Sequence, residues 1–390
     1  MTSIHCSLAC TCFAVKFQSC VSFQPTLSRR DTSFSSAMYA RYKRGGPTRR
    51  GWRHMSLLGA LMFAPGLWAS PAENTRNITE FTHGFQLISD HSTVRGFSAD
   101  QQKAHRALLT WQWAYDSGNA WSFAGDFKAL RGDNGEGLTD NVQGISNIDA
   151  EPFSKLYQAY AQYQFSDVQR MKCGQVDANL EFAMVPVAGA FISPPLGITP
   201  TAIALPTYNK PALSCSYFYE PQQGWQAMTG VFAGRGQTDF TEQFYIAETR
   251  YVTHNARMSA GYWHHHGDWK LLNDAQLRAI SGWYINYQYQ WHPQWTGFVE
   301  LSTLNDDVDE THQHRMLGVV FSPDETGQQL GVMLSQVSGP APSDEHLLEA
   351  YWLLPLTTHL QLQPVIQRIA HKADERSDST VATLRLLLQF

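Results

Sequence analysis

Ser379-Thr-Val-Ala-Thr-Leu-Arg-Leu-Leu-Leu-Gln-Phe390 is the stretch of sequence that decides the fold. Counted back from Phe390, every second residue as far as Ala382 is apolar, and polar Thr383, Arg385 and Gln389 lie between them. Successive side chains of a β-strand point to opposite faces, so a period of two indicates a strand with one apolar face. The stretch therefore predicts a β-strand that ends at Phe390.

The same alternation recurs along the body of the chain, with turn residues between the segments. Residues 107–115, 240–251 and 278–290 are examples. In residues 155–165, one face would carry Tyr157, Ala159, Ala161, Tyr163 and Phe165, and the other Gln158, Tyr160, Gln162 and Gln164. About sixteen such segments are present, the first being the weakest, centred near residues 81, 110, 125, 160, 171, 216, 229, 246, 260, 284, 299, 318, 333, 350, 365 and 385.

An even number of strands is what a barrel in an outer membrane requires, because closure leaves no unpaired strand edge in lipid. The polar faces favour Gln, Asn, Ser and scattered charges, as in a water-filled lumen, and the aromatic residues lie mostly toward segment ends, as in interfacial girdles. We therefore expect an all-β fold, a transmembrane antiparallel β-barrel of about 16 strands with a polar lumen. A secreted soluble β-sandwich is the alternative, but its polar faces would be rich in Lys and Glu.

The N-terminal region predicts an export signal in residues 38–69. A basic n-region, residues 41–53, precedes an apolar core, residues 56–69, which is too short to span a bilayer and ends in small residues. Met55 as initiator would leave no positive charge ahead of the apolar run, so Met38 is the expected start. Residues 1–37 are then an over-extended reading frame without structure.

The rest of the chain divides into an N-terminal segment with the first strand, residues 70–105, and the β-barrel, residues 106–390. No stretch of 18 or more apolar residues follows residue 70, so the sequence predicts no transmembrane helix. Nine of the 29 Lys and Arg residues, but one of the 34 Asp and Glu residues, lie in the first 54 positions. The remainder carries a formal charge of −13, which argues against a nucleic-acid partner.

Only two cysteines, Cys173 and Cys215, lie in the expected barrel. They could pair in an oxidising compartment, but we interpret them as small strand residues. The run of residues 264–266, three histidines, is expected at a loop tip, and the acidic residues 306–310 in a solvated loop that lacks EF-hand spacing. Catalytic and phosphate-binding motifs are missing as well, so we expect no metal, no cofactor and no enzyme activity.

From about Trp111 to Phe390 the chain resembles the carbohydrate-selective porin family, the OprB-like sugar porins. The first similar stretch is residues 155–165 followed by residues 171–182, which resemble paired strands ending in Gly-Lys-x-Asp-x-Asn-x-x-Phe. The second is residues 318–335, similar to a hairpin near the family's C-terminus, and the third comprises Glu345, Glu349, Tyr351, Leu360, Leu362, Pro364, Gln367, Leu384, Arg385 and Phe390. Gln175 departs from the pattern because it replaces Lys, and the chain is short for the family.

A channel for neutral sugars must select by aromatic stacking on the ring and by polar groups that replace water around the hydroxyls. Side chains that the alternation points inward are therefore candidates to line the pore and bind substrate: Arg170, Lys172, Glu242, Glu248, Arg250, Trp263, Tyr284, Glu300 and Gln367, with Tyr160 as a further aromatic. The alternative for each charge is an ion pair that braces the barrel wall, which we favour for Glu349 and Arg385.

The Pro-rich residues 182–208 cannot form one strand. They suit either a loop folded into the lumen or a surface loop, and the sequence does not separate the two.

The resemblance implies passive, substrate-facilitated diffusion of monosaccharides and similar small carbohydrates across the outer membrane of a Gram-negative bacterium. The expected partners are small neutral sugars, outer-membrane lipid and, through Phe390, the barrel-assembly machinery, since a terminal aromatic on the lipid face resembles its recognition signal. A general or differently selective porin on the same fold is the first alternative. A barrel enzyme acting on lipid or polysaccharide is the second.

Overall fold

The structure is a computed structural model. It describes residues 79–96, 101–135, 138–139, 141–193, 200–270, 277–306, 311–323, 326–339, 344–371 and 378–390. The predicted export signal, the predicted over-extended segment and the acidic residues 307–310 lie outside these ranges.

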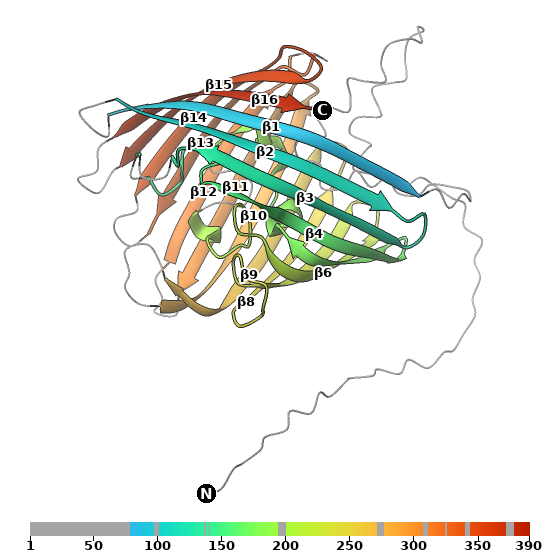
Figure 1. Ribbon diagram of the computed structural model, residues 1–390. Coiled ribbons are helices and arrows are strands. Elements are labelled where there is room, and N and C mark those ends of the chain that lie inside the picture. The colour runs from blue at the N-terminus through green and yellow to red at the C-terminus, as the bar shows by residue number, and fades with distance from the viewer. Residues whose placement is uncertain are drawn as a thin grey trace, which may run out of the picture. The chain divides into compact units, whose positions relative to one another are not determined.

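Sixteen antiparallel strands form a closed barrel in which each strand pairs with its neighbours in sequence (Figure 1). Their bounds are β1 Glu80–Arg95, β2 Gln102–Asp116, β3 Trp121–Gly132, β4 Phe153–Ser166, β5 Gln169–Val176, β6 Ala212–Gln222, β7 Trp225–Ala233, β8 Gln243–Val252, β9 Ala256–Lys270, β10 Leu277–His292, β11 Trp295–Asp306, β12 Thr311–Phe321, β13 Gln329–Ser338, β14 Glu345–Pro355, β15 Leu360–His371 and β16 Ser379–Gln389. The predicted fold is confirmed, since each of the sixteen expected segments falls on one strand.

Helical structure in the described residues is limited to three short 3-10 helices: η2 (Ala178–Leu180), η3 (Pro186–Ala190) and η4 (Pro200–Ala202). None of the helices in the described part of the chain is long and apolar enough to cross a membrane.

Closure of the barrel joins β1 to β16 over ten residue pairs, from Gln86–Gln389 to Arg95–Thr380. Phe390 extends this pairing: its backbone N–H donates to the Phe85 carbonyl at 2.9 Å, and its own carbonyl accepts from the Phe85 N–H at 3.0 Å. β1, predicted to be the weakest strand, is 16 residues long. The Phe390 side chain is 72% exposed, as expected of the last residue on an outward, apolar face.

The two faces of the wall differ as the alternation predicts. On β16, Leu384 points outward and is 42% exposed, whereas Arg385 points inward and is 3% exposed. The same alternation buries polar residues on the inner face of other strands, among them Gln158, Gln162, Glu248, Asn286, Glu300 and Gln367. The wall is therefore apolar on the outside, as contact with lipid requires. Its inner face carries polar side chains beside an apolar cluster that includes Met316, Met333 and Ile369.

The two ends of the barrel differ in the lengths of their connections. Residues 167–168, 223–224 and 293–294 form tight turns at one end, whereas residues 133–152 and 177–211 connect strands at the other. Aromatic pairs flank the tight turns, including Trp121–Tyr163, Trp225–Tyr251, Trp291–Trp295 and Trp295–Phe321. In outer-membrane barrels the short turns are periplasmic and the longer loops extracellular. We accordingly call the two ends the short-turn end and the long-loop end.

Two sequence-based interpretations are corrected in β4 to β6. The pairing of β3 with β4 shifts between Asp126 and Phe127, so that Tyr157 points into the lumen beside Gln158 instead of sharing the outward face of Ala159. Cys173 and Cys215, interpreted as unpaired strand residues, lie directly opposite each other in β5 and β6 and form a disulfide on the outward face.

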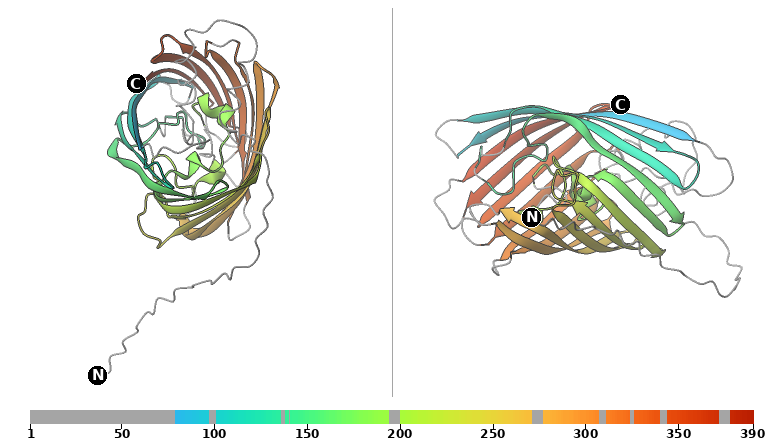
Figure 2. Two further views of the ribbon diagram at one scale, coloured as in Figure 1. Left: turned by 90° about the vertical axis from the view of Figure 1, so that its right-hand side faces the viewer. Right: turned by 60° about the horizontal axis from the view of Figure 1, so that its bottom comes forward.

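Two connections fold into the barrel and build its internal core. The left view of Figure 2 shows η-helices of the β5–β6 connection inside the ring of strands. Phe191 of this connection is fully buried and packs edge-on against Phe298 of β11 and Tyr351 of β14. Ile148 of the β3–β4 connection packs with Leu108 and Leu130 of the wall. The lumen is thus narrowed from the long-loop end.

A buried ion pair spans the strands that close the barrel, and its loss should weaken closure. Arg385 of β16 donates from Nε and Nη2 to the two carboxylate oxygens of Asp90 of β1, at 2.7 and 2.8 Å, and both side chains are buried. Replacing Arg385 by Leu leaves Asp90 buried with the Ser146 hydroxyl at 2.6 Å and with Arg106, at 4.0 Å, as its only charged partner in the described residues. We therefore expect a loss of about 3–5 kcal/mol of unfolding free energy.

The urea midpoint of the folded, heat-modifiable band on electrophoresis measures this loss. A matched control is Arg368→Leu, because Arg368 pairs with Asp378 at 2.7 Å in a half-exposed setting, where about 1 kcal/mol or less is expected. Equal urea midpoints for the two variants would contradict the proposed role of the Asp90–Arg385 ion pair in closing the barrel.

Candidate pore constriction

The Pro-rich connection between β5 and β6 begins with an anchored turn. Asp177 caps η2 by accepting the Asn179 N–H at 3.0 Å, and the Tyr157 hydroxyl donates to its other oxygen at 2.5 Å. Phe182 follows, fully buried, with its ring 6.3 Å from Phe218 and 6.2 Å from Phe232. Of the two alternatives that the sequence left open, the structure shows the loop folded into the lumen.

Buried charges from β5 and β8 surround this turn and bring together several predicted pore residues. Lys172 forms an ion pair with Glu181, and Arg170 lies 3.6 Å from the same carboxylate. Arg250 donates to the Glu181 carbonyl at 2.7 Å and pairs with Glu248 at 2.6 Å. The loop is therefore held to the wall by charge-assisted hydrogen bonds, which are stronger than neutral ones.

The environment of Glu181 keeps this carboxylate ionised. Burial raises the pKa of a carboxyl group, but Lys172 and Arg170 outweigh it, so that the pKa of Glu181 lies below its ordinary value of 4.5. A lowered pKa means that the interaction stabilises the fold above pH 4.5 and is lost only as the pH falls through the lower value. Glu181 should therefore keep its charge across the neutral range.

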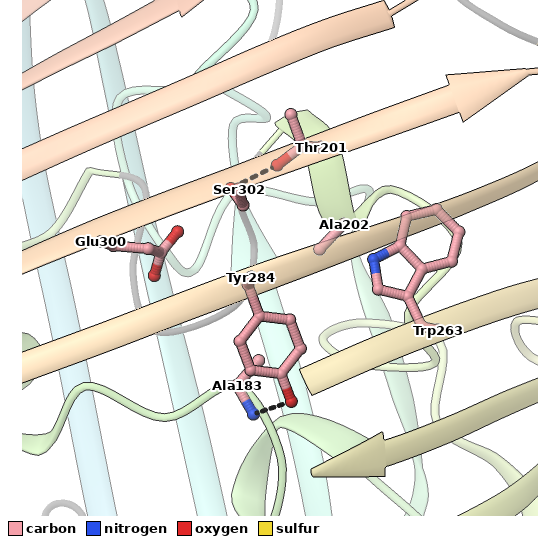
Figure 3. Close-up of a pocket in the computed structure, with 7 residues that line it drawn as sticks. All are labelled: Ala183, Thr201, Ala202, Trp263, Tyr284, Glu300 and Ser302. Atoms are coloured by element: carbon pink, nitrogen blue, oxygen red, sulfur yellow. Dashed lines mark hydrogen bonds between the residues drawn. The ribbon is translucent and has the colours of Figure 1, made fainter. Parts of the chain in front are cut away.

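Tyr284 and Trp263 are inward-facing, as predicted, but they support the loop instead of offering a free aromatic face. The Tyr284 hydroxyl donates to Glu248 at 2.6 Å and accepts from the Ala183 N–H at 3.2 Å (Figure 3). Trp263 is 2% exposed and stacks on Phe244 at 5.7 Å. Between them and the loop residue Ala202 remains a cavity of about 10 Å³, room for one water.

Two glutamates on β14 hold the two lumen connections. Glu349 accepts the backbone N–H groups of Ile192 and Ser193 at 2.7 and 2.9 Å, and Gln367 of β15 donates to it at 3.0 Å. Glu345, four residues earlier on the same inner face of β14, accepts the Val142 N–H at 2.7 Å. The ion pair that we favoured for Glu349 is therefore absent from the described residues, since Glu349 accepts hydrogen bonds from loop backbone and from Gln367 instead. The ion pair favoured for Arg385 is present, with Asp90 as its partner.

The β3–β4 connection is the part of the constriction that sequence reasoning missed. Its Ile145 carbonyl accepts from Gln367 at 3.0 Å, and its Ser146 and Asn147 accept from Arg385 at 3.2 and 2.6 Å. It also meets the other connection, since the Ser193 hydroxyl donates to the Gly144 carbonyl at 2.7 Å. One sequence signal could have indicated that this connection is buried: it is a long stretch without strand periodicity that nevertheless contains two apolar residues, Ile145 and Ile148.

The remaining predicted residues each contact one neighbouring side chain. Glu300 of β11 contacts His314 of β12 at 3.2 Å, and Tyr160 of β4 lies under the Lys172 ammonium at 4.2 Å. Glu242 precedes β8 at the long-loop end, and its carboxylate is 3.6 Å from His265.

The three histidines, predicted at a loop tip, lie within β9, where His265 points inward and is buried. No group of three or more potential metal ligands gathers in the described part of the chain.

The hydrogen bonds to Glu349 generate a prediction about the loop. Replacing Glu349 by Ala leaves two buried N–H groups without acceptors, at a cost of about 1–3 kcal/mol. The β5–β6 connection should then leave its place for part of the time, which would raise the mean single-channel conductance and add current fluctuations.

A matched control for planar-bilayer recording is Leu348→Ala on the outward face of the same strand, which should leave the conductance steady. Identical traces for the two variants would show that Glu349 does not hold the constriction.

Comparison with known proteins gives matches at the level of structure. No family model matches the chain, and no curated protein sequence matches it. Pseudomonas putida OprB in its high-pH structure aligns with a TM-score of 0.69 over 80% of this chain and 94% of that chain, at 13% identity.

Two other porins align less closely. An anion-selective porin from Comamonas acidovorans aligns with a TM-score of 0.55 at 10% identity, and a mutant of the Rh. blastica porin with 0.52 at 12%, each over 80% of this chain and 100% of the other. Identities this low establish the fold alone. The chain has the fold of the outer-membrane porins.

Proposed function

We propose that the protein is an outer-membrane porin for the passive, facilitated diffusion of monosaccharides and similar small carbohydrates. The observation that carries this proposal is a lumen narrowed by two connections that hydrogen bonds hold to the wall, and lined by charged groups of both signs. The structural likeness to OprB supports the same function. The proposed location is the outer membrane of a Gram-negative bacterium, reached through the export signal in residues 38–69.

Inward-facing charges of both signs lie along the wall, and Asp126 and Glu248 lie among the basic residues of β3 to β9. Lys and Arg residues face inward from β3 to β9, among them Lys128, Lys155, Arg170, Lys172, Arg250 and Arg257. Glu300, Glu345 and Glu349 face inward from β11 and β14, and none of the three makes an ion pair with a lysine or arginine in the described residues. Such an arrangement produces a field across the pore that orients a solute with many hydroxyl dipoles.

Amides and hydroxyls complete the lining. Gln162, Gln288 and Gln363 from three separate parts of the wall present donors and acceptors toward the connections or the lumen. Groups of this kind can replace water around the hydroxyls of a sugar at little enthalpic cost, and weak binding at several sites permits release. A general diffusion porin would share the fold, so a transport measurement must distinguish a general porin from a sugar-selective one.

Sugar transport can be tested by liposome swelling and by single-channel recording. We expect proteoliposomes to swell in glucose faster than in a disaccharide, and glucose at high concentration to reduce the ion current. Absence of current block by any monosaccharide, with normal conductance, would overturn sugar selectivity and leave the general porin.

The ion pairs around Glu181 generate a second prediction. Glu181→Gln removes the carboxylate that neutralises Lys172 and Arg170, so the reversal potential in a KCl gradient should shift toward chloride by several-fold in permeability ratio. Acidification of the wild type below pH 4.5 should cause the same shift, because the pKa of Glu181 is lowered. Asp239→Asn, in the exposed β7–β8 connection, removes an equal charge and should leave the selectivity unchanged. An equally large shift below pH 4.5 in the Glu181→Gln variant would contradict this assignment.

A further inference from the structure

We propose that Lys128, Lys155 and Lys210 form a capture site for the carboxylate of sugar acids at the long-loop end of the lumen. This inference rests on the proposed function, because it adds a class of substrate to the same channel. We call these three residues the lysine cluster.

The register of the barrel brings two of the lysines face to face. Lys128 of β3 and Lys155 of β4 are directly paired across the strands. Their neighbours Phe127 and Leu156 point outward and are exposed, so both lysines point into the lumen. Like charges directly opposite each other in a sheet are destabilising, and an anion that binds between them removes that repulsion.

Lys210 adds a third positive charge. It lies just before β6, at the end of the β5–β6 connection, and the charges that act on Lys155 come from Lys210 and Lys128. None of the three makes an ion pair with a carboxylate in the described residues. The carboxylate that acts on Lys128 is that of Asp126, which is buried below it and accepts a hydrogen bond from Gln158 at 2.9 Å. The lysine cluster therefore keeps a positive excess.

Aromatic rings and backbone hold the two strand lysines in place. The Lys128 ammonium lies 3.7 Å from the ring centroid of Tyr157, and the Lys155 ammonium 5.9 Å from the same ring. Lys155 also donates to the Asn209 carbonyl at 2.5 Å. Because each ammonium has three donors, these contacts leave donors for a solute carboxylate. Lys128 and Lys155 are partly exposed and Lys210 is exposed, so the site is open to solvent.

Nearer the short-turn end of the lumen lies another cation, which forms no ion pair within the described residues. Arg257 of β9 has buried Nε and Nη2 atoms that make no hydrogen bond, and the charges that act on it include both Arg250 and Glu248. An anion that leaves the lysine cluster would thus meet a second positive group on the same wall. This arrangement favours passage of the anion through the lumen over its retention at the long-loop end.

Competition between a sugar acid and its neutral counterpart tests the proposal. Block of the single-channel current by glucuronate and by glucose is measured with the full-length barrel in planar bilayers at 0.1 M KCl. We expect glucuronate to block at roughly tenfold lower concentration, because a cleft lined by one sign of charge concentrates its counter-ion. The advantage should disappear at 1 M KCl, where the Debye length falls to about 3 Å.

Charge variants locate the site. The double variant Lys128→Gln, Lys155→Gln should bring the ratio of the two blocking concentrations close to one, whereas Lys155→Arg keeps the charge and should keep most of the ratio. Lys210→Gln, which leaves the wall intact, should give an intermediate loss. Lys103 lies near the same end on the outward face of β2, so Lys103→Gln serves as the control and should leave the ratio of blocking concentrations unchanged.

The outcomes separate this inference from the proposed function. Equal block by glucuronate and glucose in the wild type would overturn the capture site while sugar transport stands. An unchanged ratio in both the double variant and Lys210→Gln would also overturn it. Absence of block by glucose would instead count against the proposed function, whatever glucuronate does.

Discussion

Pairing of every strand edge is the constraint on which the rest of this structure depends. A strand in lipid has no water to satisfy its backbone, so the last strand must meet the first. Here the pairing of β16 with β1 extends to the final residue, since Phe390 and Phe85 exchange both backbone hydrogen bonds. Once the ring is closed, each inward position is fixed in height and direction, and side chains from distant strands can act on the same loop.

The connections inside the lumen are held mainly by carboxylates and arginines of the wall. Glu349 and Glu345 accept backbone N–H groups from two different connections, and Arg385 donates to Ser146 and Asn147. A wall that must be polar toward water thereby supplies the partners that a loop without regular structure needs. The constriction is rigid because its own backbone is satisfied by the barrel, and the small cavity beside Tyr284 is the space left over.

Much of the fold could be predicted from the sequence, because period-two alternation reports directly on a wall with two different faces. Face assignments failed at Tyr157, where a register shift that alternation alone cannot reveal turns the side chain inward. Trp263 and Tyr284 were placed on the correct face. Whether an inward-facing ring is free to contact a solute, however, depends on the loop that packs over it, and alternation does not report on that loop. The β3–β4 connection was missed because its anchors, such as Glu345, are far away in the sequence.

The disulfide between Cys173 and Cys215 encloses the whole β5–β6 connection in a covalent ring, with the two cysteines 42 positions apart. Cross-linking over that span removes about 4 kcal/mol of chain entropy from the unfolded ensemble. The ring also forbids β5 and β6 from sliding past each other, since they are joined across the outward face. The width of the pore is therefore governed partly by a bond that lies outside it, on the side where water-borne reductants have the poorest access.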